Sequence, residues 1–107
     1  MVDEEQLASI VADIRAHYHP LQVILFGSYA HGQAHAGSDL NLCLVVKEAG
    51  DWLERQAEFR RRFDPPGIYL QPVIYTSAEL ERLGAEGQPF VREILEEGRV
   101  LHERRRS

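Results

Sequence analysis

Two short apolar runs, separated by a glycine-rich polar segment, constrain this chain more than any other feature. The runs Leu21–Phe26 and Leu40–Val46 are too short for typical helices and are bounded by turn residues, so each predicts a buried strand. The segment between them begins with Gly27-Ser28 and ends with Ser38-Asp39. Its glycines predict a short helical turn followed by a loop. We therefore expect polar side chains where the first strand ends and the second begins.

Apolar residues at helical spacing predict four helices around these strands. The expected helices are residues 4 to 18, a helix containing Trp52 to Phe63, a short helix ending near Gly84, and a last helix with Gly98 as its C-cap. Three of them carry the capping-box pairs Asp3 with Gln6, Asp51 with Glu54, and Thr76 with Glu79. Helix boundaries are thus set locally, by side chains that satisfy the first backbone N–H groups.

Two further strands complete the expected sheet. Ile68–Tyr75 contains Pro72, which cannot donate a ladder hydrogen bond, so this strand is expected at an edge or locally unpaired. Val100–His102 adds a final short strand. Strands that alternate with helices predict an α/β or α+β domain with a small mixed sheet flanked by helices.

Size, charge and cysteine content restrict the class of protein. The 107 residues form one domain, 1–107, with 44% apolar and 27% charged residues, as in ordinary globular proteins. Apolar runs are too short for a membrane span or a secretory signal. The single cysteine, Cys43, cannot form an internal disulfide and indicates a reducing, cytoplasmic setting. A net charge of −5 argues against a broad nucleic-acid surface, and Arg104–Arg106 is expected to be a solvated tail, with a partner contact as the lesser alternative.

The second predicted strand carries polar residues on one face. Asp39, Asn41, Cys43 and Val45 share one face by the period of two, and the intervening residues share the other. Side chains at i and i+2 project side by side, and two carboxylates so placed could hold magnesium ions. Here the second position is an amide. The Gly27-Ser28 turn lies before a helical turn, where backbone N–H groups suit a phosphate oxygen.

Ten residues separate Ser28 from Asp39, and this arrangement resembles the signature of the nucleotidyltransferase superfamily that includes DNA polymerase beta, in its minimal stand-alone form. The matching residues are Gly27-Ser28, Tyr29-Ala30, Gly32 and Ser38-Asp39-Leu40. The similarity extends over nearly the whole chain, including Pro72–Thr76 and Ile94–Leu101. It implies a polymerase-beta palm-like fold and ATP or another nucleoside triphosphate bound at Gly27, Ser28, Gly32 and Ser38.

The same resemblance implies three cooperating carboxylates, of which this chain keeps one. The three positions fall at Asp39, Asn41 and Gln71, and the first two would be the magnesium ligands. An amide oxygen brings no charge to a dication and cannot take a proton from an attacking hydroxyl. Losing a base alone typically costs roughly 10²- to 10⁴-fold in rate. We therefore expect weak or absent transfer, with Glu48 and Asp64 poorly placed to substitute.

Three functions are consistent with this sequence. In the first, which the resemblance implies, the chain binds a nucleotide, has a degenerate site and works as the antitoxin of a small helical partner of the HEPN type. In the second, it is an active enzyme that transfers a nucleoside monophosphate from ATP to a hydroxyl of a protein, RNA or small molecule. In the third, it is a scaffold without nucleotide affinity. The oligomeric state stays open, a homo-oligomer included.

Several other residues have simple structural interpretations. The histidine pairs lack a Cys–His constellation, so no structural zinc site is expected, and His31 or His35 is either an exposed loop residue or a phosphate contact. Cys43 is expected to be a partly buried core residue, and Tyr29 either packs the turn or stacks near a base. The helix aromatics Trp52, Phe59 and Phe63 are expected in the core or at an interface.

Overall fold

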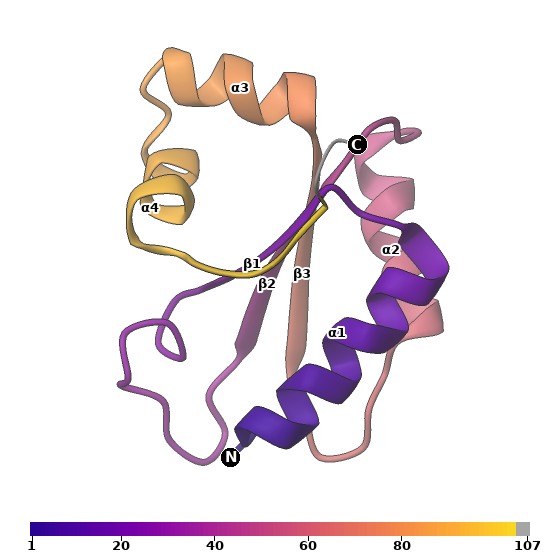
Figure 1. The fold of residues 1–107 in the computed structure, drawn as a ribbon, viewed down its shortest axis with the longest axis vertical. Coiled ribbons are helices and arrows are strands. Elements are labelled where there is room, and N and C mark those ends of the chain that lie inside the picture. The colour runs from indigo at the N-terminus through magenta and orange to yellow at the C-terminus, as the bar shows by residue number, and fades with distance from the viewer. Residues whose placement is uncertain (105–107) are drawn as a thin grey trace.

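The structure of the chain is a computed structural model that describes residues 1–104. These residues contain four helices and four strands (Figure 1). In chain order they are α1 (Glu4–Tyr18), β1 (Gln22–Phe26), β2 (Leu40–Val46), α2 (Trp52–Arg62), β3 (Leu70–Thr76), α3 (Ser77–Ala85), α4 (Pro89–Glu97) and β4 (Arg99–Glu103). The predicted tail falls mostly outside the described residues, which include Arg104 but not Arg105 and Arg106.

The strands form one mixed sheet in the order β3-β2-β1-β4. β1 pairs antiparallel with β2 and with β4, whereas β2 and β3 are parallel and are joined by α2. The predicted mixed α+β fold is therefore confirmed. β3 is an edge strand, as Pro72 predicted, because the missing N–H faces no neighbouring strand there. The strand begins at Leu70 rather than Ile68, after the Pro65-Pro66-Gly67 turn.

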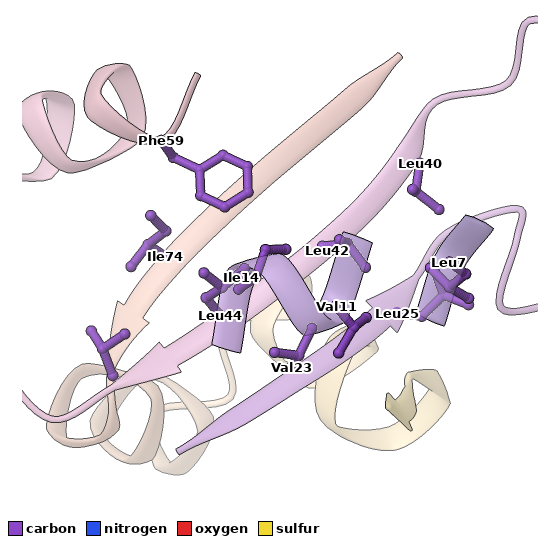
Figure 2. Close-up of a cluster of buried hydrophobic side chains, with 11 residues drawn as sticks. Leu7, Val11, Ile14, Val23, Leu25, Leu40, Leu42, Leu44, Phe59 and Ile74 are labelled. Carbon is purple, nitrogen blue, oxygen red and sulfur yellow. The ribbon is translucent and has the colours of Figure 1, made fainter. Parts of the chain in front are cut away.

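Helices cover both faces of the sheet (Figure 1). α1 and α2 lie on one face, where Ile14 and Phe59 are fully buried against Leu42 and Leu44 of β2 (Figure 2). α3 and α4 lie on the other face, where Leu80, Val91 and Ile94 pack against strand residues. Two apolar clusters on opposite sides thus hold one sheet, as in other layered domains.

The alternation predicted for β2 is confirmed. Leu40, Leu42, Leu44 and Val46 belong to the cluster under α1 and α2. Cys43 and Val45 belong to the cluster under α3 and α4. Asn41 therefore faces the α3 and α4 side, near the end of the sheet where β2 begins. Of the α2 aromatics, Phe59 is buried and Phe63 partly buried, whereas Trp52 stays 39% exposed beside Tyr75.

Most helix-capping predictions are confirmed. Asp3 with Gln6 and Thr76 with Glu79 form reciprocal capping boxes. At α2 only half of the predicted box forms: the Asp51 carboxylate accepts from the Glu54 N–H at 3.4 Å, and the Glu54 carboxylate instead pairs with Arg61 at 2.9 Å. The Glu54 carboxylate therefore binds the Arg61 guanidinium instead of the Asp51 backbone N–H, which is the bond that would complete a capping box.

Gly98 ends α4 as predicted, although its backbone is extended rather than left-handed. A Cβ at this position would overlap the Ile94 carbonyl and the Ile24 side chain, so close packing explains the glycine. No helix among residues 1–104 is both long and apolar enough to cross a bilayer.

Candidate functional site

Three strands bring the predicted site residues to one end of the sheet. Asn41, near the start of β2, pairs with Phe26 at the end of antiparallel β1. On its other side Asn41 pairs with Gln71, near the start of parallel β3. Residues paired in register project to the same face of a sheet, so the two amides lie side by side. Asp39 lies just before β2, is exposed, and shares the face of Asn41 by strand parity.

The turn after β1 packs directly against Asn41. Gly27 has a positive φ of 78°, a conformation that favours glycine. A Cβ at Gly27 would lie 2.5 Å from the Asn41 side-chain nitrogen, so any other residue here would also have to displace the Asn41 amide. The Gly27-Ser28 turn and the Asn41 side chain therefore pack against each other.

The segment after Gly27 forms the predicted helical turn. The Gly27 carbonyl accepts hydrogen bonds from the N–H groups of Ala30 (3.0 Å) and His31 (3.3 Å), and the Ser28 carbonyl accepts from Gln33 at 2.9 Å. Gly32 then adopts φ 69° with open space around it, which lets the chain leave the turn. Ser28 is half-buried at the start of this turn, next to Gly27, which packs against Asn41 of β2.

Ser38 has a local partner that sequence reasoning missed. Its hydroxyl accepts the His35 N–H at 2.9 Å, and its own N–H donates to the His35 carbonyl at 2.9 Å. These reciprocal bonds close the loop immediately before Asp39. The pattern is typical of serine in tight turns, so residue type and spacing could have indicated it.

Tyr29 packs the turn. Its hydroxyl accepts a hydrogen bond from the Val2 N–H at 3.0 Å, and its ring packs against the cluster under α1 and α2. The loop therefore lies beside the N-terminus of α1 (Figure 1). On the other side, His31 Nε2 lies 3.9 Å from a Glu97 carboxylate oxygen near the end of α4, an ion pair when the imidazole is protonated.

Gln71 has an unexpected partner. Its side-chain oxygen accepts a hydrogen bond from Arg60 Nη2 at 2.8 Å, so a cation from α2 reaches the sheet edge beside the site. Arg61 and Arg62, next in sequence, pair instead with Glu54 and Glu58. The only sequence signal was this run of three arginines, and the run alone could not show which one turns toward Gln71.

The remaining candidates do not join the site. Cys43 is fully buried rather than partly buried, and burial raises the pKa of its thiol to about 12, which disfavours a reactive thiolate. Glu48 lies beyond the far end of β2, and Asp64 lies beside Ile10 and Phe63 on the α1 and α2 side. Among residues 1–104 no three His, Cys, Asp or Glu side chains gather in a metal-binding group.

Comparison with known proteins agrees with this geometry. The family model described as "Polymerase beta, Nucleotidyltransferase" matches residues 8–107. The chain belongs to the polymerase beta nucleotidyltransferase family. A crystal structure described as that of a "putative nucleotidyltransferase" from Sulfolobus solfataricus superposes with a TM-score of 0.63 over 92% of this chain and 78% of that chain. The two are 18% identical, so this match supports the fold. No curated protein matches the chain significantly.

The magnesium that this nucleotidyltransferase family implies does not fit the residues present. The three candidate ligand positions offer one carboxylate, Asp39, and two amides. The Gln71 oxygen already accepts a hydrogen bond from a cationic guanidinium, which would repel a dication. Magnesium needs hard, preferably anionic oxygens to replace its water. We therefore assign no chemical step to a metal at this site.

Proposed function

We propose that this member of the polymerase beta nucleotidyltransferase family binds a nucleoside triphosphate, has lost transfer chemistry, and acts in the cytoplasm by contact with a partner. The observation that carries the proposal is the register pair Asn41–Gln71. It puts two neutral amides side by side where active relatives are expected to have carboxylates. Asp39 alone supplies negative charge at the three positions.

Nucleotide binding is supported by the turn at the end of β1. Gly27 and Ser28 open a helical turn. Backbone N–H groups at the start of such a turn can donate hydrogen bonds to phosphate oxygens. Gly32 and Ser38 shape the rest of the loop, and the Ser38 hydroxyl bonds within it. The role of Ser38 in our proposal is therefore to hold the loop rather than to contact the ligand.

The partner in our proposal is a small helical protein of the HEPN type, with this chain as its antitoxin. This part rests on the resemblance to minimal nucleotidyltransferases, which are commonly paired with such proteins. A site with one carboxylate favours neutralisation by contact over modification of the toxin.

The alternative is an active enzyme that transfers a nucleoside monophosphate from ATP to a protein, RNA or small-molecule hydroxyl. It is favoured by Gly27, Ser28 and Asp39, which are the residues of the family pattern that this chain keeps. In that case Asp39, helped by Asn41, would bind magnesium. Positioning of the reactants alone could then sustain slow turnover.

A transfer assay separates the two functions. The chain is incubated with labelled ATP, magnesium and the candidate partner, and Asp39→Ala is tested in parallel. We expect no transfer above background from either protein, together with ATP binding by titration calorimetry. Labelling that Asp39→Ala abolishes would establish the enzyme, whereas no ATP binding under any condition would leave only a scaffold.

The antitoxin role is tested by coexpression with a neighbouring helical protein that arrests growth. If neutralisation works by contact, Asp39→Ala rescues growth as well as the natural chain does, and the two proteins copurify. Rescue that is lost in Asp39→Ala while copurification persists would contradict the contact model and support chemistry.

A further inference from the structure

The Arg60 guanidinium forms no ion pair within residues 1–104 and lies at the β3 edge of the candidate site. Six other arginines within residues 1–104 pair with a carboxylate at 2.6 to 3.3 Å, namely Arg55, Arg61, Arg62, Arg82, Arg92 and Arg99. Arg60 shares with Arg15 and Arg104 the absence of such an ion pair in this part of the chain. The hydrogen-bond partner of Arg60 is instead the neutral Gln71 oxygen at 2.8 Å. The guanidinium stays exposed and has five N–H donors, of which this bond uses one.

The position of Arg60 follows from the sheet. Arg60 lies on α2, whose buried Phe59 packs on the opposite face of the sheet from Asn41. Because β3 is an edge strand, the Arg60 side chain can extend past it to Gln71, which shares the face of Asn41. The Gly27 turn packs on Asn41 from the other side. Gln71 is thus two strands from the turn, roughly 10 Å at the strand spacing of sheets.

We propose that Arg60 takes the place of the missing metal, so that this site binds a nucleoside triphosphate in its metal-free form. This inference rests on the nucleotide binding proposed above. The Gly27-Ser28 turn holds one end of the phosphate chain, and the guanidinium binds the other. A single phosphate is too short to contact both groups, whereas a triphosphate has several anionic groups in a row.

The chemistry of the groups favours the metal-free ligand. A guanidinium binds phosphate oxygens with charge-assisted, often bidentate hydrogen bonds. Magnesium bound to ATP would neutralise part of the negative charge on the phosphate oxygens. It would also place a dication near the positive Arg60 guanidinium, and the two would repel each other. Asp39 is exposed and repels the phosphates weakly through water. In metal-free binding Arg60 therefore raises the affinity for ATP and Asp39 lowers it slightly. In magnesium-dependent binding Asp39 would instead raise the affinity and Arg60 would lower it.

The test is calorimetric titration of ATP into the full chain, once with EDTA and once with excess magnesium. We expect the natural chain to bind at least as tightly in EDTA as in magnesium. Arg60→Gln should weaken binding in EDTA by about tenfold or more, the loss expected for a charged hydrogen bond. Arg62→Gln is the matched control, since it removes the same charge from the same helix, and should change affinity less than about twofold.

A second variant tests the sign of the Asp39 effect. Asp39→Asn should bind ATP in EDTA as tightly as the natural chain or more tightly, whereas a magnesium ligand would be lost in this variant. Circular dichroism and urea unfolding confirm that each variant is folded. Binding that requires magnesium and ignores Arg60→Gln would overturn the role of Arg60 while leaving nucleotide binding intact. Absence of ATP binding under both conditions would overturn both proposals.

Discussion

Asn41 and Gln71 lie opposite each other in the parallel pairing of β2 and β3, although thirty positions separate them in the chain. Two neutral amides therefore occupy neighbouring places at one end of the sheet, with Asp39 just before them. In our proposal these two amides stand where active relatives have carboxylates, so the site carries little negative charge. Its consequences for binding and stability can be measured separately.

Restoring both carboxylates should create a magnesium site. Asn41→Asp with Gln71→Asp places three acidic groups together, and their mutual repulsion is relieved by a dication. We expect magnesium to raise the melting temperature of this double variant but not that of the natural chain. Labelled-ATP transfer should rise by about 100-fold or more, in line with a regained base and metal.

The control for that experiment is the same pair of substitutions combined with Asp39→Ala. This triple variant should lose both the magnesium-dependent melting shift and the transfer activity. A double variant that stays folded yet shows no response to magnesium would show that the three positions do not form one site.

A side chain at Gly27 should destabilise the fold. Gly27→Ala forces a Cβ into a left-handed backbone and to within 2.5 Å of the Asn41 amide. We expect a loss of about 1–3 kcal/mol in the free energy of unfolding, measured with urea. Gly32→Ala is the matched control, since Gly32 also has a positive φ, 69°, but a Cβ there meets nothing within 4 Å. Equal stability of the two variants would contradict the crowding at the turn.

Tyr29 should affect stability rather than nucleotide affinity. Tyr29→Phe leaves the Val2 N–H without its acceptor and should cost about 0.5–1 kcal/mol in urea unfolding, since water can partly replace the bond. Tyr29→Leu also removes the ring, and under folding conditions its ATP affinity should match that of the natural chain. A large loss of ATP affinity in Tyr29→Leu alone would instead indicate stacking on the base.

The ion pair of Arg55 and Glu79 should make stability depend on acid pH. The Arg55 guanidinium, 2.6 Å away, lowers the pKa of Glu79 from 4.5, mainly through its hydrogen bond. Since the folded pKa is depressed, the stabilisation is complete above 4.5 and is lost as the pH falls through the folded pKa. Glu79→Gln keeps the cap acceptor but not the charge, and should cost about 1 kcal/mol at pH 7.

The difference between the natural chain and Glu79→Gln should therefore shrink when urea unfolding is repeated between pH 5 and pH 3. Glu4→Gln is the control, because Glu4 and Arg99 form an ion pair that is largely exposed and screened by solvent. A difference for Glu79→Gln that stays constant with pH would exclude the charge as its cause.

Local patterns predicted the elements well because their causes are local. The period of two placed Asn41 and Cys43 on one face of β2, and side chains three residues apart capped α1 and α3. The half-formed box at α2 failed because Arg61, outside the four-residue pattern, binds the Glu54 carboxylate. Such competition depends on side-chain reach rather than on a motif.

The sequence alone determined the strands, the helices, the Gly27-Ser28 turn and the family, since these depend on residues close together in the chain. The resemblance also predicted three carboxylate positions, of which only Asp39 is acidic in this sequence. Tertiary structure decided that Gln71 lies beside Asn41 and that Arg60 extends past the β3 edge to meet it. Contacts of this kind follow from strand order and from the packing of α2, because segments far apart in the chain meet only when the sheet forms.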